Sequence, residues 1–118
     1  MTAEETLVSV LNAAATVTAL VSTRIYNRLV PIDKQLPAIA IRRTETEFFT
    51  TIHVSTVQAG RAQIEVACMA DTVGAAENLG TVVMAALGTA GHIVVSRSSE
   101  EDIDLGTWAV LLVVTVWE

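Results

Sequence analysis

The sequence predicts a single α+β domain over residues 1–118, built on a mixed, largely antiparallel sheet of about four to five strands. Two main helices pack on one face of that sheet, and a loop projects from it. Three observations support this prediction: a strand pattern over 61–70, a helix pattern directly after it over 72–87, and an apolar closing segment over 108–117. A chain of 118 residues suffices for one core and is short for two domains.

The segment from Arg61 to Gly88 is the centre of the predicted fold. Its strand has two alternating faces. The apolar face, toward the core, is formed by Ala62, Ile64, Val66 and Cys68, and the other face by Arg61, Gln63 and Glu65. We expect Asp71 to cap the following helix, because a carboxylate accepts hydrogen bonds from the first free N–H groups. Apolar residues then recur at helical spacing, namely Val73, Ala76, Leu79, Val83, Ala86 and Leu87. Gly88 is expected to end this helix in the left-handed conformation.

The N-terminal quarter predicts two helices and then extended chain. Thr2 and Glu5 form a capping box, so the first helix is expected to begin there. The β-branched run 16–18 weakens that helix, and a second short helix is expected up to about Val21. An extended segment then begins at Arg24.

The next segments predict a strand that leaves the core. Pro31 and Pro37 bracket a loop, and a strand follows over 38 to about 46 that turns polar at Arg42. We therefore expect it to project. The stretch 48–60 has strand-forming residues but no clear partner, and it is predicted to be a projecting loop or hairpin.

The C-terminal third predicts two further strands. One covers 92–97, and the acidic stretch 98–106 that follows it is interpreted as a solvated turn. The closing strand over 108–117 is apolar on both faces, which is typical of a strand covered on each side. We expect helices on one face of it and another element, such as a neighbouring subunit, on the other.

The composition predicts self-association. Apolar residues make up 52% of the chain and charged residues only 17%, compared with a usual charged share of about 25%. The longest apolar run, 108–114, is far shorter than the roughly 20 residues that a membrane span needs, and the acidic start is unlike an export signal. We therefore expect synthesis in the cytoplasm, no membrane partner, and a homo-oligomer that buries the excess apolar surface.

Charge and motifs give no sign of catalysis or of nucleic-acid binding. The net charge of −6 opposes contact with nucleic-acid phosphates but is compatible with a passage through which DNA slides. Cys68 is interpreted as a core residue, and His53 and His92 lack metal-ligand spacing. We predict no catalytic residue, no cofactor and no metal, and the protein is not expected to be an enzyme.

Several segments together resemble the tail completion, or tail terminator, proteins of long-tailed, siphovirus-like bacteriophages. The similar stretches are Leu20-Val21, Arg24-Ile25-Tyr26, Leu36-Pro37-Ala38-Ile39, the strand 61–68, the helix ending at Leu87-Gly88, and Val114-Thr115-Val116-Trp117. The resemblance covers nearly the whole chain. It departs from the family pattern over 48–60, where the usual segment is more polar and richer in glycine.

The resemblance implies a structural virion protein of the tail or neck. Such a subunit forms a ring, as a hexamer, on the end of the finished tail tube, stops tube growth and provides the surface for head-tail joining. Its implied partners are further copies of itself, the major tail tube protein and the head-tail connector protein, and DNA passes through its lumen without specific binding. The alternative from the residues alone is a small cytoplasmic enzyme or ligand-binding α+β domain.

Two groups of residues are predicted to make these contacts. The first group, for partner proteins, combines apolar residues without a core position and a basic pair: Phe48, Phe49, Ile52, His53, Val54, Arg42 and Arg43. For the basic pair, protection of a strand edge by charge is the alternative. The second group, for neighbouring subunits, comprises uncharged residues on the outward side of the second main helix: Gly74, Asn78, Thr81 and Met84.

Overall fold

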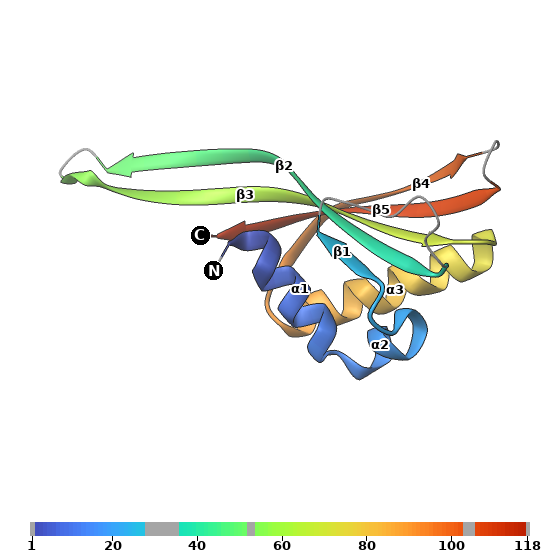
Figure 1. The fold of residues 1–118 in the computed structure, drawn as a ribbon. Coiled ribbons are helices and arrows are strands. Elements are labelled where there is room, and N and C mark those ends of the chain that lie inside the picture. Colours follow the sequence, from blue (N-terminus) through green and yellow to red (C-terminus); the bar gives the residue numbers. More distant parts are fainter. Residues whose placement is uncertain (1, 28–35, 52–53, 103–105, 118) are drawn as a thin grey trace.

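The computed structural model describes residues 2–27, 36–51, 54–102 and 106–117 (Figure 1). Within these ranges the elements in chain order are α1 (Ala3–Ala13), α2 (Ala15–Val21), β1 (Ile25–Asn27), β2 (Ala38–Thr51), β3 (Val54–Ala70), α3 (Val73–Thr89), β4 (Ile93–Asp102) and β5 (Thr107–Trp117). No single described helix is long and apolar enough to cross a membrane. α1 and α2 meet that test only as a pair, and the pair is bent by 89°.

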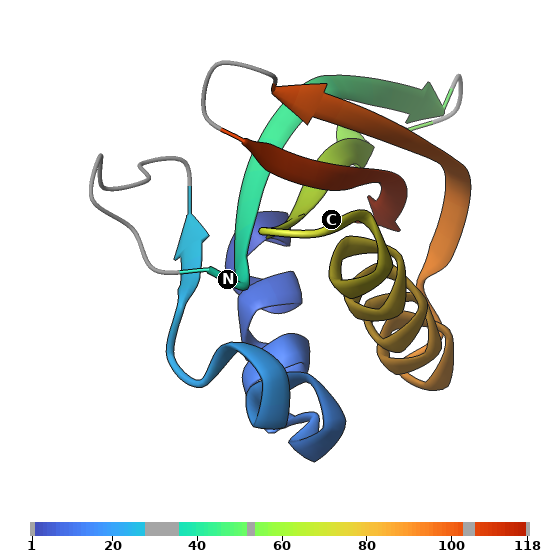
Figure 2. The same cartoon turned by 90° about the vertical axis from the view of Figure 1, so that its right-hand side faces the viewer.

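The strands form one mixed sheet in the order β1-β2-β3-β5-β4. β1 is parallel to β2, and the other neighbours are antiparallel. The helices of the described chain all lie on one side of this sheet (Figures 1 and 2). The predicted α+β class and the mixed, largely antiparallel sheet are therefore confirmed.

The core fills the space between α1, α3 and the sheet. The predicted inward residues of β3, from Ala62 to Cys68, are buried, and so are Val110, Leu112 and Val114 on β5. In register, Leu112 is opposite Val66, so these residues form one apolar surface across the central strands. Leu79, Val83 and Leu87 of α3 are buried in the same cluster. The prediction for this part of the core is confirmed.

α1 and α3 each begin directly after a threonine whose hydroxyl group caps the helix. The Oγ1 atom of Thr2 accepts a hydrogen bond from the backbone N–H of Glu5 (3.2 Å), as predicted. At α3 the capping residue is Thr72, whose Oγ1 accepts from the N–H of Ala75 (3.2 Å). The prediction of Asp71 was wrong by one residue. Both residue types cap helices well, so the choice depends on where the strand before them ends.

The end and the first turn of α3 also differ from the prediction. Gly88 lies inside the helix, and the left-handed residue is Gly91, with φ of 87°. Val73, which was predicted to belong to the apolar stripe, is exposed at the first position of the helix. The stripe that reaches the core begins one turn later, at Ala76.

Two strands are longer than predicted. β4 continues to Asp102, so the predicted turn from Ser98 is wrong: Ser98 pairs with Leu111 and Glu100 with Ala109. An edge strand tolerates such polar residues because one side of it faces solvent. β2 continues to Thr51 instead of ending near 46.

Two glycines of α3 provide a test of this packing. An alanine Cβ at Gly80 would lie 2.8 Å from Cγ1 of Val110, whereas one at Gly88 would meet no atom within 4 Å. We expect Gly80→Ala to lower the free energy of unfolding by about 1–3 kcal/mol. Gly88→Ala should raise it by about 0.5–1 kcal/mol, since alanine favours helix. Urea unfolding of both variants checks this, and destabilisation by Gly88→Ala would place that residue outside the helix.

Candidate interaction surfaces

The most prominent surface is an arm formed by the distal parts of β2 and β3. β5 pairs with β3 only over 61–70, and β1 pairs with β2 only over 39–41. Residues 45–51 and 54–60 therefore pair with each other and with no third strand of the described chain. Figure 1 shows this two-stranded ribbon extending beyond the body of the domain. Such a ribbon is marginally stable in water by itself, which makes the arm a natural place for a partner.

The arm carries three of the seven predicted partner contacts. In register, Phe48 is opposite Gly60, Phe49 is opposite Ala59, and Val54 is opposite Thr51. The predicted contacts Ile52 and His53 lie outside the described residues. The prediction of a projecting hairpin over 48–60 is thus confirmed for its strands, while the contact roles stay predictions.

An ion pair fixes the base of the arm to α1. Both Nε and Nη2 of Arg43 donate to Oε1 of Glu4, at 2.9 and 2.6 Å. The carboxylate of Glu4 is only 2% exposed, so its charge depends on this partner. Breaking a buried pair is costly because one charge loses its compensation. The structure therefore gives Arg43 a contact within its own chain.

Arg42 points to the opposite face of the sheet. Its Nη2 lies 3.2 Å from Oε1 of Glu65 on β3, and its side chain remains 66% exposed. An exposed pair of this kind contributes about 0–1 kcal/mol. Arg42 is therefore accessible to a partner in a way that Arg43 is not.

The outer face of the sheet lies away from the helices (Figure 2). Its centre is apolar and half-buried, and the residues there are Ala67, Met69, Ala109, Leu111 and Val113. The closing strand, β5, is apolar on both faces, but the helices cover only one of them. The expected second cover is not supplied by the part of the chain that the structure describes.

The predicted subunit-contact residues on α3 divide into two sets. Gly74 and Asn78 are exposed. Thr81 and Met84 contact Arg97 of β4, whose Nη1 lies 3.3 Å from Oγ1 of Thr81 and 3.3 Å from Sδ of Met84. The edge strand of the same chain therefore already contacts part of the side that was predicted to face a neighbour.

A polar cluster joins α3 to β4 around Glu77. Nη2 of Arg97 donates to Oε2 of Glu77 (2.6 Å), and the hydroxyl of Ser99 donates to Oε1 (2.8 Å). The hydrogen bonds from Ser99 and from Arg97 hold the pKa of Glu77 below its ordinary value of 4.5. The charged form of Glu77 is therefore favoured in the folded chain.

This lowered pKa predicts a pH effect on stability. A carboxyl group with a lower pKa in the folded state stabilises the fold above its unfolded pKa and loses that contribution as the pH falls. We expect the melting temperature of the wild type to exceed that of Glu77→Gln at neutral pH. The difference should shrink as the pH falls below 4.5. Thermal melts of both proteins between about pH 7 and pH 3 measure it, and a difference that grows on acidification contradicts the assignment.

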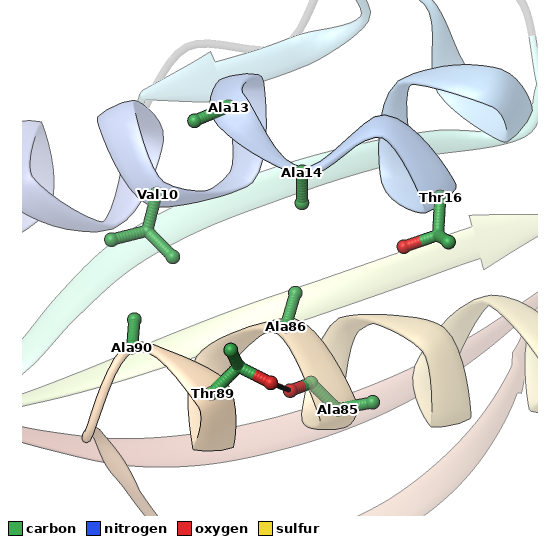
Figure 3. A pocket seen from close by; sticks show the side chains of 8 residues that line it. All are labelled: Val10, Ala13, Ala14, Thr16, Ala85, Ala86, Thr89 and Ala90. Carbon is green, nitrogen blue, oxygen red and sulfur yellow. Dashed lines mark hydrogen bonds between the residues drawn. The ribbon is translucent and has the colours of Figure 1, made fainter.

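A groove separates the α1–α2 bend from the end of α3. It has a volume of about 440 Å³ and is lined by Val10, Ala13, Ala14, Thr16, Ala85, Ala86, Thr89 and Ala90. Figure 3 shows Val10 and Ala14 pointing toward Ala86 and Ala90 across the gap. The lining residues offer methyl and hydroxyl groups and none that titrates near neutral pH.

The remaining reactive side chains are placed as follows. Burial raises the pKa of Cys68 to about 12, so its thiol is protonated and inert near neutral pH. Among the described residues no three His, Cys, Asp or Glu side chains gather in a group that suits a metal ion. Among the described side chains there is thus neither a reactive thiol nor a metal-binding group.

Comparisons with known proteins agree with this description. Residues 5–117 match the family described as tail completion protein gp17. Among solved structures, one chain of the virion of a native gene transfer agent particle is similar, with a TM-score of 0.66 and 15% sequence identity. The similarity covers 98% of this chain and 92% of that one, and it concerns the fold. A comparison with curated proteins finds no match.

Proposed function

The chain belongs to the tail completion protein gp17 family, and we propose that it closes into a homo-oligomeric ring, a hexamer, on the end of a finished tail tube. A structural protein of a phage virion tail acts by assembly. In this role the ring stops tube growth and presents the surface to which the DNA-filled head docks. Its partners are the major tail tube protein on one side and the head-tail connector protein on the other.

The arm is the observation that carries the proposal. A two-stranded ribbon without a third strand gains stability only where another surface covers it. The apolar outer face of the sheet has the same need, because large apolar patches are rarely left in water. A ring supported on a tube offers cover for both, from the neighbouring subunit and from the tube.

The charge of the chain is compatible with a DNA passage. At a net charge of −6 per subunit, a ring repels the phosphates of the DNA that passes through it. DNA then moves through the lumen without specific binding. The same charge requires that copies meet through surfaces that are uncharged or complementary.

The alternative of an enzyme or a ligand-binding domain would use the groove between α1, α2 and α3. That groove is lined by alanine, threonine and valine. Binding sites for small molecules usually add a few convergent polar or charged groups that fix orientation. The lining of this groove does not supply them, and we therefore favour assembly.

The test is the length of tails made without this chain. Phage particles from cells in which its gene is deleted should show overlong tails without heads in electron micrographs. Wild-type protein supplied from a plasmid should restore uniform tails and attached heads, which serves as the control. Tails of normal length that carry heads in the absence of the chain would contradict the proposal.

A further inference from the structure

Two strand edges of the described chain lack a neighbour and have the same length. β4 is the last strand of the sheet and offers the ten residues Ile93–Asp102. β1 pairs with β2 only at residues 39–41, so none of the described strands pairs with the outer edge of β2 over 42–51. Free edges present unpaired N–H and C=O groups, and these groups accept another strand.

We propose that β4 of one copy adds as an antiparallel strand to residues 42–51 of β2 in the next copy. Asp102 then lies beside Arg42, and Ile93 lies beside Thr51. This inference rests on the proposed ring and specifies how its subunits are joined. It gives the arm a third strand and covers the free edge of β4 with the same contact.

The order of charges along the two edges favours this direction. Arg42 begins the part of β2 that no described strand covers, and Asp102 ends β4. The antiparallel register sets these two opposite charges beside each other, which is favourable, whereas a parallel register would set Arg42 beside Ile93. Arg43 already binds Glu4 of its own chain and is not counted toward the contact. Glu45 beside Glu100 is a like-charged pair that offsets part of the gain.

The exposed apolar start of β4 meets an uncharged part of β2 in this register. Ile93 and Val95 are 63% and 57% exposed. Ile93 would lie beside Thr51 and Val95 near Thr50, while Phe48 and Phe49 would lie beside Arg97 and Ser96. A parallel arrangement would instead place this part of β2 beside the acidic end of β4.

The β-bulges on the two edges are compatible with the pairing. The β2–β3 ladder is irregular between Arg43 and Glu45, where Thr44 is the extra residue of β2, and between Thr50 and Thr51, where the extra residues belong to β3. The β4–β5 ladder is irregular between Val94 and Ser96. Each edge therefore carries one extra residue over its ten positions. One extra residue moves the side chains that follow it to the other face of the sheet. Because each strand has one such residue, paired side chains lie on the same face at both ends of the contact.

The direction of the strands is the one that a ring requires. β4 runs antiparallel to β5, and β2 runs antiparallel to β3, so β4 and β2 of one chain also point in opposite directions. Antiparallel addition thus leaves the second copy in the same orientation as the first, with its helices on the same side. Two different edges meet at every contact, and such head-to-tail contacts form a ring when the rotation between neighbouring copies closes.

The offset between neighbouring copies is also compatible with closure. Within one chain, Ile93 pairs with Thr115, Thr115 pairs with Gln63, and Gln63 pairs with Glu45. Ile93 and Glu45 therefore lie at the same height along the strands. In the proposed contact Ile93 is level with Thr51 of the neighbour, which shifts each copy by about six residues or roughly 20 Å along the strands. Each copy adds four strands, about 19 Å across. The strands then tilt by roughly 45°, close to the tilt of closed barrels.

The first test reverses charges at one end of the contact. Arg42→Asp and Asp102→Arg should each weaken self-association about tenfold, measured by analytical ultracentrifugation, and the double variant should recover most of it. Glu5→Arg, an exposed change on α1, is the matched control and should have no effect. Glu65→Gln removes the partner of Arg42 within its own chain and should also leave association unchanged.

The second test joins the other end covalently. The natural cysteine, Cys68, is buried, so introduced cysteines report without background. Thr51→Cys with Ile93→Cys should form disulfides between chains under mild oxidation, visible as a ladder of linked subunits on a non-reducing gel. Thr51→Cys with Asp102→Cys, which tests the parallel register, should not.

These outcomes separate the inference from the proposed function. Rings that form normally in Arg42→Asp and in Asp102→Arg, or that link only through a cysteine at residue 102, would overturn the strand pairing and leave the ring intact. A wild-type chain that stays monomeric both alone and with tail tubes would instead overturn the ring itself.

Discussion

Replacing Phe48 and Phe49 together with serine is expected to abolish capping of the tail while leaving the isolated subunit folded. Residues 48 and 49 pair only across the arm, with Gly60 and Ala59, and no third strand of the described chain reaches them. We therefore propose that these two residues contact a partner protein. The melting temperature of the isolated double variant should change by less than about 2 °C. Overlong or headless tails in electron micrographs report the loss of capping.

A matched control replaces the next two arm residues, Thr50 and Thr51, with serine, which keeps the hydroxyl groups and removes only methyl groups. This variant should cap normally. The contradicting result is a Phe48→Ser, Phe49→Ser protein that melts several degrees lower and whose folded fraction still caps tails. That result would mean that the two phenylalanines fold back as a lid on the sheet.

Truncating Leu112 to alanine is expected to have the largest effect on stability. Its side chain is fully buried at the centre of β5, opposite Val66, and beneath α3. Deleting a buried leucine side chain costs about 2–5 kcal/mol, from lost burial and from the cavity that remains. The free energy of unfolding from urea titration should fall by that amount.

Leu111→Ala is the control, because Leu111, the residue before Leu112, is half-buried on the outer face of the same strand. It should cost about 1 kcal/mol or less in the isolated subunit. Equal losses at both positions would mean that the outer face is also covered within one chain. A negligible loss at Leu112 would remove β5 from the centre of the sheet.

The sequence was sufficient where a periodic pattern determines the structure. The alternation over 61–70 and the helical spacing of Leu79, Val83 and Leu87 both depend on burial, and both are confirmed. Boundaries were less accurate. Thr72 and Asp71 are both good caps, and Gly88 and Gly91 can both end a helix, so local propensity did not decide between them.

The polar contacts could not be predicted from the sequence. Glu4 is one of two acidic residues in the first turn of α1, where a negative charge interacts favourably with the helix dipole even without an ion-pair partner. Its partner, Arg43, is 39 positions away in the sequence. Arg97 likewise appears on an ordinary alternating strand. Its contacts with Glu77, Thr81 and Met84 arise only because α3 folds back over β4. Such pairs depend on the tertiary fold and leave no periodic signal.

The most direct measurement of the central claim is electron cryomicroscopy of tail tubes mixed with the purified chain. Tubes assembled without this protein are incubated with it, and images of the tube ends are averaged. A sixfold ring of added density on one end of each tube, together with an end to further growth, is the predicted result. Bare tube ends, or subunits bound along the length of the tube, would contradict it.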